Sequence, residues 1–205
     1  MSLSGTDHAQ LGRTLYDAMR ANTPIQPLTQ THPTITVEDA YQISRAMLSH
    51  RLERDREVVV GKKIGVTSDA VQSMLGVFQP DFGFLTDAMH CEDGATVSLK
   101  QTGLIQPKAE GEIAFMLKAD LKGPGITREQ VMAATEWVAP CFEIVDSRID
   151  DWKIKIQDTV ADNASCGVFV VGQQHTDPYA LDLAAAAMQM WKNDAPAGAG
   201  LGSAV

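Results

Sequence analysis

Apolar residues at helical spacing mark the first fifth of the chain. They recur at every fourth position, at Leu11, Leu15 and Met19, which places them on one face of a helix. Segment 22–33 contains three prolines and is predicted to be a loop. The tetrapeptide TVED at 36–39 then resembles a capping box that opens a second helix. The stripe of that helix consists of Ala40, Ile43 and Met47.

After residue 56 the pattern becomes rich in β-branched residues and glycine, which favours strands. Strands are predicted at 57–67, 95–99, 104–106, 110–118, 141–148, 167–172 and 186–193, with a turn running into a short strand at 79–89. Thr67 or Ser68 is expected to cap a short helix that ends before Gly76. A capping box at 127–130 opens another helix, which Pro140 is expected to end.

The order of these elements predicts the fold class. Strands outnumber helices and do not alternate with them regularly, which argues against a doubly wound sheet. We therefore expect an α+β fold, with a helical N-terminal cap over residues 1–56 and a mixed β core over residues 57–205.

Composition and charge exclude several classes of protein. The 205 residues are 44% hydrophobic and 21% charged, as in ordinary globular domains. No apolar run has the length of a membrane span, and the N-terminus lacks the apolar core of a signal peptide. A net charge of −9 would repel nucleic acid. We therefore expect a cytoplasmic protein with neither a membrane nor a nucleic-acid partner.

The basic segments 51–56 and 153–155 are short and mixed with acids, so we interpret them as solvated faces. Three widely spaced cysteines support neither a disulfide framework nor a CxxC zinc site. The five histidines are scattered, and no pair of them has a spacing that suits zinc.

Three glutamates lie in segments with strand character. Glu110 and Glu112 are two residues apart, so a strand would point both carboxylates to one face. A buried pair of this kind needs protons or a cation for neutralisation, whereas a solvated edge needs neither. Glu143 lies between Phe142 and Ile144 in another predicted strand. Three such carboxylates can form an all-oxygen site for Mg²⁺ or Mn²⁺.

Other polar residues have two readings. Lys63 alternates with two glycines, which would let a ligand approach, but the pattern alone does not decide whether Lys62 or Lys63 points into a site. Asp81 is placed in a turn, where an aspartate commonly bonds the backbone. Asp158, Asp162 and Asn163 form a polar cluster before a strand, which turn chemistry alone would also explain.

Taken together, four segments resemble the 2-oxopent-4-enoate (2-hydroxypenta-2,4-dienoate) hydratases, in the hydratase/decarboxylase branch of the fumarylacetoacetate hydrolase superfamily. The segments are GKKIGVTSDAVQSMLGVFQPDFGFL, LIQPKAEGEIAF, PCFEIVDSRIDDWKIKIQDTVADNASCGVFVVG and GAGLGSAV. The resemblance runs from about Thr36 to the C-terminus. It implies a β-roll or sandwich core of the fumarylacetoacetate hydrolase type.

The resemblance also implies roles for individual residues. Glu110, Glu112 and Glu143 would bind Mg²⁺ or Mn²⁺. Lys63 and Asp81 would act as acid/base or enolate-stabilising groups. A supporting role in substrate binding falls to Asp162, Asn163 and Ser165.

The activity that the resemblance implies is hydration of 2-hydroxypenta-2,4-dienoate to 4-hydroxy-2-oxopentanoate, in meta-cleavage degradation of aromatic compounds. The alternatives are the related 4-oxalocrotonate decarboxylase and a truncated, non-catalytic partner subunit. Family members continue past GAGLGSAV, so a chain truncated at its C-terminus is expected. The resemblance further implies a homo-oligomer and a complex with 4-oxalocrotonate decarboxylase.

Overall fold

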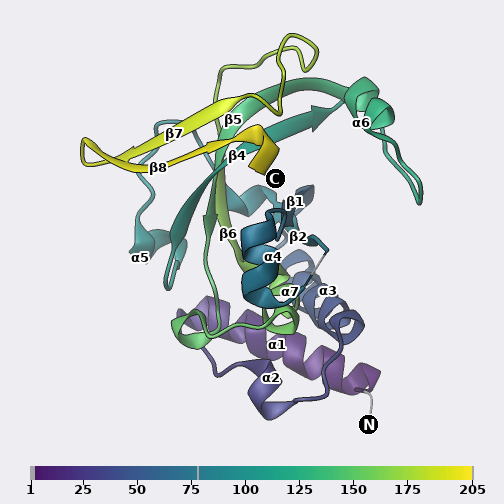
Figure 1. Cartoon of the computed structure of the whole chain (residues 1–205). Coiled ribbons are helices and arrows are strands. Elements are labelled where there is room, and N and C mark those ends of the chain that lie inside the picture. The colour runs from purple at the N-terminus through teal and green to yellow at the C-terminus, as the bar shows by residue number, and fades with distance from the viewer. Residues whose placement is uncertain (1–2, 78, 205) are drawn as a thin grey trace. The chain divides into compact units, whose positions relative to one another are not determined.

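The computed structural model describes residues 3–77 and 79–204, with backbone alone at 70, 74 and 75 (Figure 1). The chain forms two compact units, and each is composed of several segments. The first unit consists of Met1–Cys91, Ala95–Ala109 and Ile144–Phe169. The second unit consists of Glu92–Gly94, Glu110–Glu143 and Val170–Val205.

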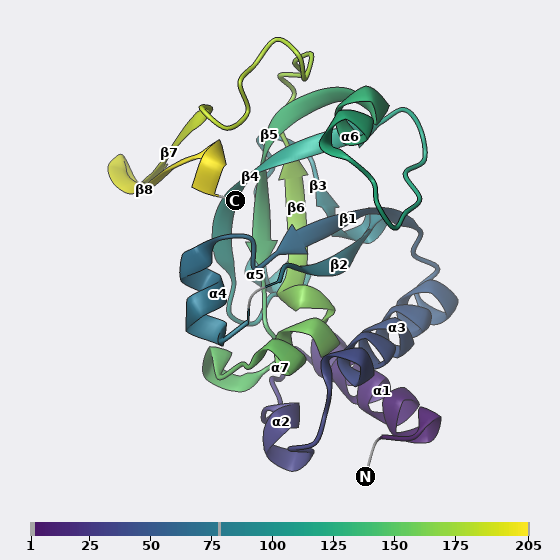
Figure 2. The ribbon, with the colours of Figure 1, turned by 45° about the vertical axis from the view of Figure 1, so that its right-hand side comes forward.

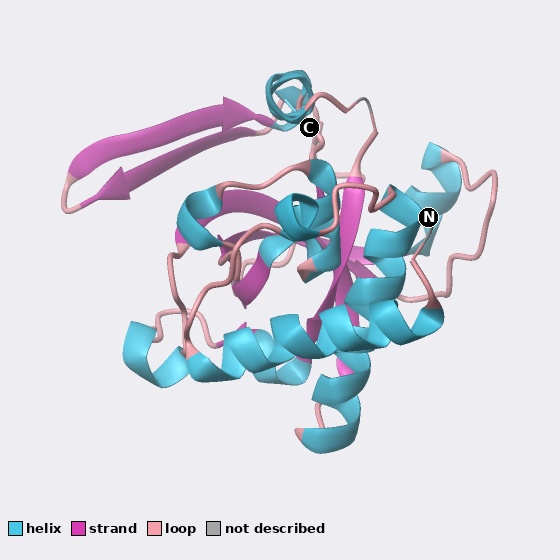
Figure 3. Cartoon of the chain, turned by 90° about the horizontal axis from the view of Figure 1, so that it is seen from below, coloured by secondary structure: helices cyan, strands magenta, loops and turns pink. Residues whose placement is uncertain are grey.

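Helices form the N-terminal part of the first unit, as predicted, and Figure 3 draws them in cyan. They are α1 (Gly5–Ala21), α2 (Leu28–Thr31) and α3 (Val37–Arg54). The predicted capping box is present, since Thr36 and Asp39 bond each other's backbone at the start of α3. Helices α1 and α3 approach closely at Gly12, where a Cβ atom would lie 2.6 Å from the Cβ of Ala46. His8 of α1 also bonds Asp39, with 2.8 Å between Nε2 and Oδ1.

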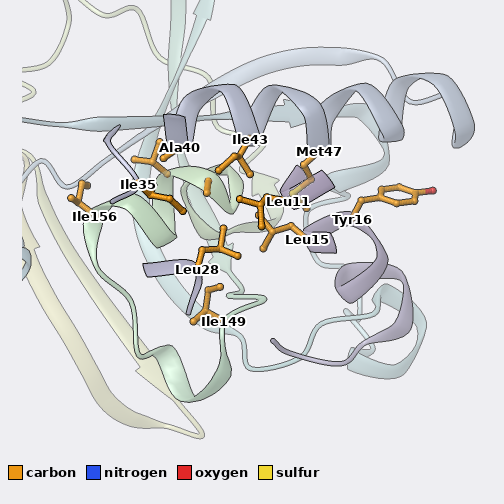
Figure 4. Close-up of a cluster of buried hydrophobic side chains, with 12 residues drawn as sticks. Leu11, Leu15, Tyr16, Leu28, Ile35, Ala40, Ile43, Met47, Ile149 and Ile156 are labelled. Atoms are coloured by element: carbon orange, nitrogen blue, oxygen red, sulfur yellow. The ribbon is translucent and has the colours of Figure 1, made fainter. Parts of the chain in front are cut away.

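The core of the first unit joins these helices to a distant segment of the chain (Figure 4). α7 (Ile156–Ala161) supplies residues to the same apolar cluster as α1 and α3. Its buried members are Leu11, Leu15, Tyr16, Leu28, Ile35, Ala40, Ile43, Met47, Ile149, Ile156, Val160 and Ala161. Each large aliphatic side chain removed from water stabilises the fold by about 1.5–3 kcal/mol.

An antiparallel hairpin of β1 (Val59–Gly65) and β2 (Asp81–Thr86) also belongs to the first unit (Figure 2). In its register Lys63 pairs with Gly83, and Gly65 pairs with Asp81. The segment of chain that connects the two strands contains α4 (Asp69–Leu75). Ser68 caps this helix and Gly76 ends it in the left-handed conformation, as predicted.

A four-stranded sheet has the strand order β3-β6-β5-β4. Its strands are β3 (His90–Cys91), β4 (Lys108–Leu117), β5 (Thr135–Val145) and β6 (Cys166–Val171). β4, β5 and β6 each contribute residues to both units. The helix α5 (Leu99–Thr102) precedes β4.

The second unit contains α6 (Arg128–Ala134) and the antiparallel hairpin of β7 (Ala187–Lys192) and β8 (Ala195–Leu201), the yellow hairpin of Figure 1. The two turn residues of this hairpin, Asn193 and Asp194, both have positive φ, of 50° and 63°. Asparagine and aspartate tolerate that conformation better than most residues, so they suit a tight two-residue connection.

Several local predictions were wrong. Segments 95–99 and 104–106 are not strands, and residues 99–102 form α5 instead. α6 ends at Ala134, well before Pro140, which lies within β5. Pro140 has no N–H to donate, but its carbonyl accepts a hydrogen bond from Gly172 N at 2.8 Å. α2 also interrupts the predicted 22–33 loop.

The interpretation of segment 51–56 as a solvated face was wrong for Arg51, because the side chain of Arg51 is buried. Its Nε donates to Glu57 at 2.7 Å and its Nη2 to Thr86 at 3.1 Å. An arginine buried in this way needs an anionic partner, and Glu57 supplies it.

The α+β fold class is confirmed. The boundary between a cap at 1–56 and a core at 57–205 stays a prediction, since α1 and α3 share their core with α7 from the other side of that boundary. Among the helices that the structure describes, none combines the length and apolar character needed to cross a membrane.

Candidate active site

Lys63 and Asp81 lie on one face of the β1–β2 hairpin, above a glycine. A Cβ atom on Gly65 would lie 2.5 Å from Asp81 Oδ1 and 2.9 Å from Lys63 Nζ. Both polar groups therefore occupy the space that a larger residue at position 65 would fill. The Lys63 ammonium also donates a hydrogen bond of 3.0 Å to the carbonyl oxygen of Ala164.

This geometry shows which of the two lysines, Lys62 or Lys63, lies on the same face as Asp81. Lys62 is exposed, and its Nζ lies 5.4 Å from the ring centroid of Phe82 and 5.6 Å from that of Phe84. Those distances are typical of cation–π contacts. Lys63, on the opposite side of the strand, is the lysine that accompanies Asp81.

Asp81 begins a strand and is 4% exposed, so its placement in a turn was wrong. The preceding residue, Pro80, lies just outside the strand, where its missing backbone donor costs no ladder hydrogen bond. Tyr41 stacks on Phe82 with 4.6 Å between ring centroids. Burial raises the pKa of Tyr41, and the negative charge of Asp81 raises it further.

Residues 163–165 form a tight turn against this hairpin. The amide of Asn163 bonds the backbone of Phe84 twice, accepting from its N at 2.8 Å and donating to its O at 2.9 Å. A Cβ atom on Gly83 would lie 2.5 Å from Asn163 O, so only glycine allows this approach. Ser165 is buried, and its Oγ lies 3.1 Å from Thr159 Oγ1. The structure therefore brings Asn163 to the Lys63–Asp81 hairpin, whereas the hydroxyl of Ser165 bonds α7.

Asp162 lies in the interior of the first unit and is fully buried. Its carboxylate accepts hydrogen bonds from Arg148, at 2.6 Å from Nε and 2.8 Å from the backbone N. Complete burial raises the pKa of Asp162 to about 6, against the lowering effect of Arg148. Hydrogen bonds within the protein occupy this carboxylate, which fits a supporting role.

Arg148, the partner of Asp162, was not predicted from the sequence. One signal was available, because Arg148 stands beside Ile149 at the end of an apolar strand. A charged residue in that setting needs a buried partner of opposite charge, and Asp162 was already a candidate.

The three glutamates belong to the second unit and differ in burial. Glu110 is exposed, Glu112 is half-buried and Glu143 is 6% exposed. Burial raises the pKa of the Cys141 thiol to about 12, and the negative charges of Glu112 and Glu143 contribute to that rise. Both carboxylates therefore act electrostatically on the same sulfur.

Over residues 3–77 and 79–204, no three His, Cys, Asp or Glu side chains lie close enough together to hold a metal ion. The set of Glu110, Glu112 and Glu143 thus stays a prediction. Its chemistry fits a hard divalent cation, since all the donors are carboxylate oxygens.

Comparison with known proteins found close relatives, although no protein-family model matches the chain. A 2-hydroxyhexa-2,4-dienoate hydratase from Comamonas testosteroni is 74% identical over 194 residues, which are 95% of this chain and 73% of the relative. A 2-hydroxypent-2,4-dienoate hydratase from Pseudomonas putida is 58% identical over 195 residues, which are 95% of this chain and 87% of the relative.

A solved structure has the same fold. The 4-oxalocrotonate decarboxylase from Pseudomonas putida G7, complexed with magnesium and adipate, matches with a TM-score of 0.93 and 34% sequence identity. The match covers 99% of this chain and 76% of the decarboxylase. The chain therefore belongs to the 2-oxopent-4-enoate (2-hydroxypenta-2,4-dienoate) hydratase family, in the hydratase/decarboxylase branch of the fumarylacetoacetate hydrolase superfamily.

Proposed function

We propose that the chain catalyses hydration of 2-hydroxypenta-2,4-dienoate to 4-hydroxy-2-oxopentanoate with the help of a divalent metal ion. The observation that carries this proposal is the 74% and 58% identity to dienoate hydratases over 95% of the chain. The decarboxylase shares the fold, but its lower identity of 34% favours the hydratase reaction.

The carboxylates Glu110, Glu112 and Glu143 would hold Mg²⁺ or Mn²⁺. When bound, such a cation supplies Lewis-acid stabilisation of negative charge on the C2 oxygen of the substrate. Support for a metal comes from the magnesium in the decarboxylase complex and from the all-oxygen donor set.

The proton transfers fall to Lys63 and Asp81. The enol oxygen at C2 loses a proton and C5 gains one, which leaves a ketone conjugated with the C3–C4 double bond. Water then adds its oxygen at C4, and C3 takes up a proton, so the sum is one substrate and one water. Lys63 is suited to hold or deliver a proton, since the Ala164 carbonyl fixes its ammonium group. Asp81 is suited to accept one, because its buried carboxylate lies on the same face of the hairpin as Lys63.

The residues at the turn would keep this pair in place. Asn163 fixes the turn to β2, Ser165 bonds Thr159, and Asp162 anchors the segment to Arg148. Their proposed part in substrate binding is therefore support for the hairpin face.

The test follows loss of dienol absorbance from freshly generated 2-hydroxypenta-2,4-dienoate and 2-hydroxyhexa-2,4-dienoate, with Mn²⁺ or with EDTA. We expect metal-dependent hydration of at least one substrate. Release of CO₂ from 2-oxohex-3-enedioate without hydration would instead identify a decarboxylase. Mn²⁺ binding without turnover of any of these substrates would favour a non-catalytic partner subunit.

The proposal also includes the association of this chain with other protein chains. A homo-oligomer and a complex with 4-oxalocrotonate decarboxylase stay predictions from the family resemblance, and so does a cytoplasmic location. Sedimentation of the chain alone and mixed with the decarboxylase would test both assemblies.

A further inference from the structure

We propose that Arg148 is a positioning residue for Lys63, acting through Asp162 and the turn at residues 163–165. The inference deepens the proposed function and rests on it, because Lys63 is assigned to proton transfer there.

The guanidinium of Arg148 is 2% exposed and is surrounded by acceptors. Its Nε donates to Asp162 Oδ1 at 2.6 Å, and its Nη2 donates to the Asp162 carbonyl oxygen at 2.5 Å. Its Nη1 donates to the carbonyl oxygens of Asp146 and Cys166. One planar group thus fixes both ends of the segment from Asp162 to Cys166.

That segment has an unfavourable backbone conformation. Asn163, Ala164 and Ser165 have φ angles of 54°, 51° and 54°. Left-handed conformations are costly for residues with a Cβ atom, and three in succession need surrounding contacts that over-determine them. Arg148 supplies such contacts on both sides of the turn, and the buried Asp162 carboxylate cannot move away from it without losing its counter-charge.

The turn at residues 163–165 also holds the side chain of Lys63 in place. Because the left-handed conformation of Ala164 sets where its carbonyl points, it also sets the position of the Lys63 ammonium, 3.0 Å away. The two bonds between Asn163 and Phe84 fix the same turn to the partner strand of Lys63. The contacts therefore run from Arg148 through the turn to Lys63 without a gap.

Arg148→Lys keeps the positive charge but loses the planar fork, so it cannot make all of these bonds. The first measurement is acetylation of Lys63 by an amine-reactive ester, with Lys62 as an internal reference, read by mass spectrometry. We expect the Lys63 to Lys62 labelling ratio to rise about fivefold, the factor for losing one hydrogen bond. The kcat should fall about tenfold or more, since small misplacements are costly, while KM and Mn²⁺ affinity stay unchanged.

Arg51→Lys is the matched control. Arg51 is another buried arginine of the first unit, with the partners Glu57 and Thr86 and no hydrogen bond to the 162–165 segment. It should lose stability in the same way but leave the labelling ratio and kcat unchanged. A labelling ratio and kcat that also stay unchanged in folded Arg148→Lys would overturn the proposal.

Asn163→Gly keeps the proposal testable if Arg148→Lys does not fold. Glycine accepts the φ of 54°, and the substitution removes only the two bonds to Phe84. A raised labelling ratio is expected, and an unchanged one would show that the turn does not position Lys63. Because labelling needs no turnover, a chain without hydratase activity would refute the proposed function and leave this inference to be decided separately.

Discussion

The Lys63–Asp81 hairpin face and the glutamates of β4 and β5 differ in how their residues are held. On the hairpin face, hydrogen bonds join Lys63 to Ala164, 101 positions away, and Phe84 to Asn163, 79 positions away, and the buried Asp81 lies on the same face as Lys63. Among the glutamates, burial ranges from the exposed Glu110 to the buried Glu143, within two segments of strand. The first group is an arrangement of complementary charges and carbonyls, whereas the second consists of like charges.

This difference has a physical meaning for the two kinds of group. Opposite charges and carbonyl acceptors stabilise one another, so the protein fold alone can preorganise them. Like carboxylates repel, and a cation is what makes their convergence favourable. Substitutions at the glutamates should therefore act on metal affinity, and substitutions at the hairpin face should act on catalysis with metal affinity unchanged.

The largest effect is expected for Glu143→Gln, which keeps the shape of the side chain and removes its charge. Hydration should fall by about a thousandfold, in the range for losing a group that stabilises transition-state charge. Mn²⁺ affinity, measured by isothermal titration calorimetry, should fall with it. Glu136→Gln changes an exposed glutamate of the same strand and should alter neither quantity. Wild-type Mn²⁺ affinity in Glu143→Gln would remove this residue from the metal set.

Lys63→Met should lower kcat by about a hundredfold to ten-thousandfold, the usual range for losing a proton-transfer group. Mn²⁺ affinity should be unchanged, which separates the two groups of residues. Lys62→Met is the matched control, since Lys62 is exposed on the other side of the same strand. Equal losses in the two variants would contradict the assignment of Lys63.

Gly83→Ala should destabilise the first unit by about 3 kcal/mol, because the added methyl group meets a backbone oxygen that is hard to displace. That oxygen belongs to Asn163 and would lie 2.5 Å away. Gly61→Ala is a control in the same hairpin, where the added Cβ would meet Leu85 at an ordinary 3.6 Å. Urea unfolding compares the two. Equal stability of both variants would show that the carbonyl oxygen of Asn163 does not exclude a side chain at position 83.

The smallest effect concerns pH. The native pKa of Asp162 is raised from 3.8 to about 6, so the native state holds this proton more tightly than the unfolded chain does. The resulting stabilisation is complete below pH 3.8 and is lost as the pH rises through 6. Relative to Asp162→Asn, the free energy of unfolding of the wild type should fall by up to about 3 kcal/mol over this interval. A difference that rises with pH would mean that Arg148 outweighs the effect of burial.

Local signals predicted much of the fold. The capping boxes at Thr36 and Thr127 and the glycine at position 76 were located correctly, since each depends on residues within four positions. The helix predicted to run up to Pro140 was wrong because tertiary pairing overrode the local pattern after Ala134.

The site was predictable only in part. The alternation of Lys63 with glycines indicated a bare face, but the choice between the lysines needed Ala164, about 100 residues away. Arg148 was missed because its role follows from acceptors on separate segments, and no local pattern reports those. The glutamate pair was a candidate because its spacing matches the period of a strand, which is a local property, and its place in a metal site stays a prediction.

The division of the first unit into separate stretches of chain also affects how the protein folds during synthesis. This unit is assembled from three stretches of chain, with residues of the second unit between them. Thr29 bonds Asp158 across 129 positions, and Lys63 bonds Ala164 across 101. Contacts of such high sequence separation slow folding, because long loops must close first. The N-terminal helices and the β1–β2 hairpin therefore cannot complete these contacts until the residues around 165 have left the ribosome. Until then we expect their apolar surfaces to be exposed to aggregation or chaperone binding.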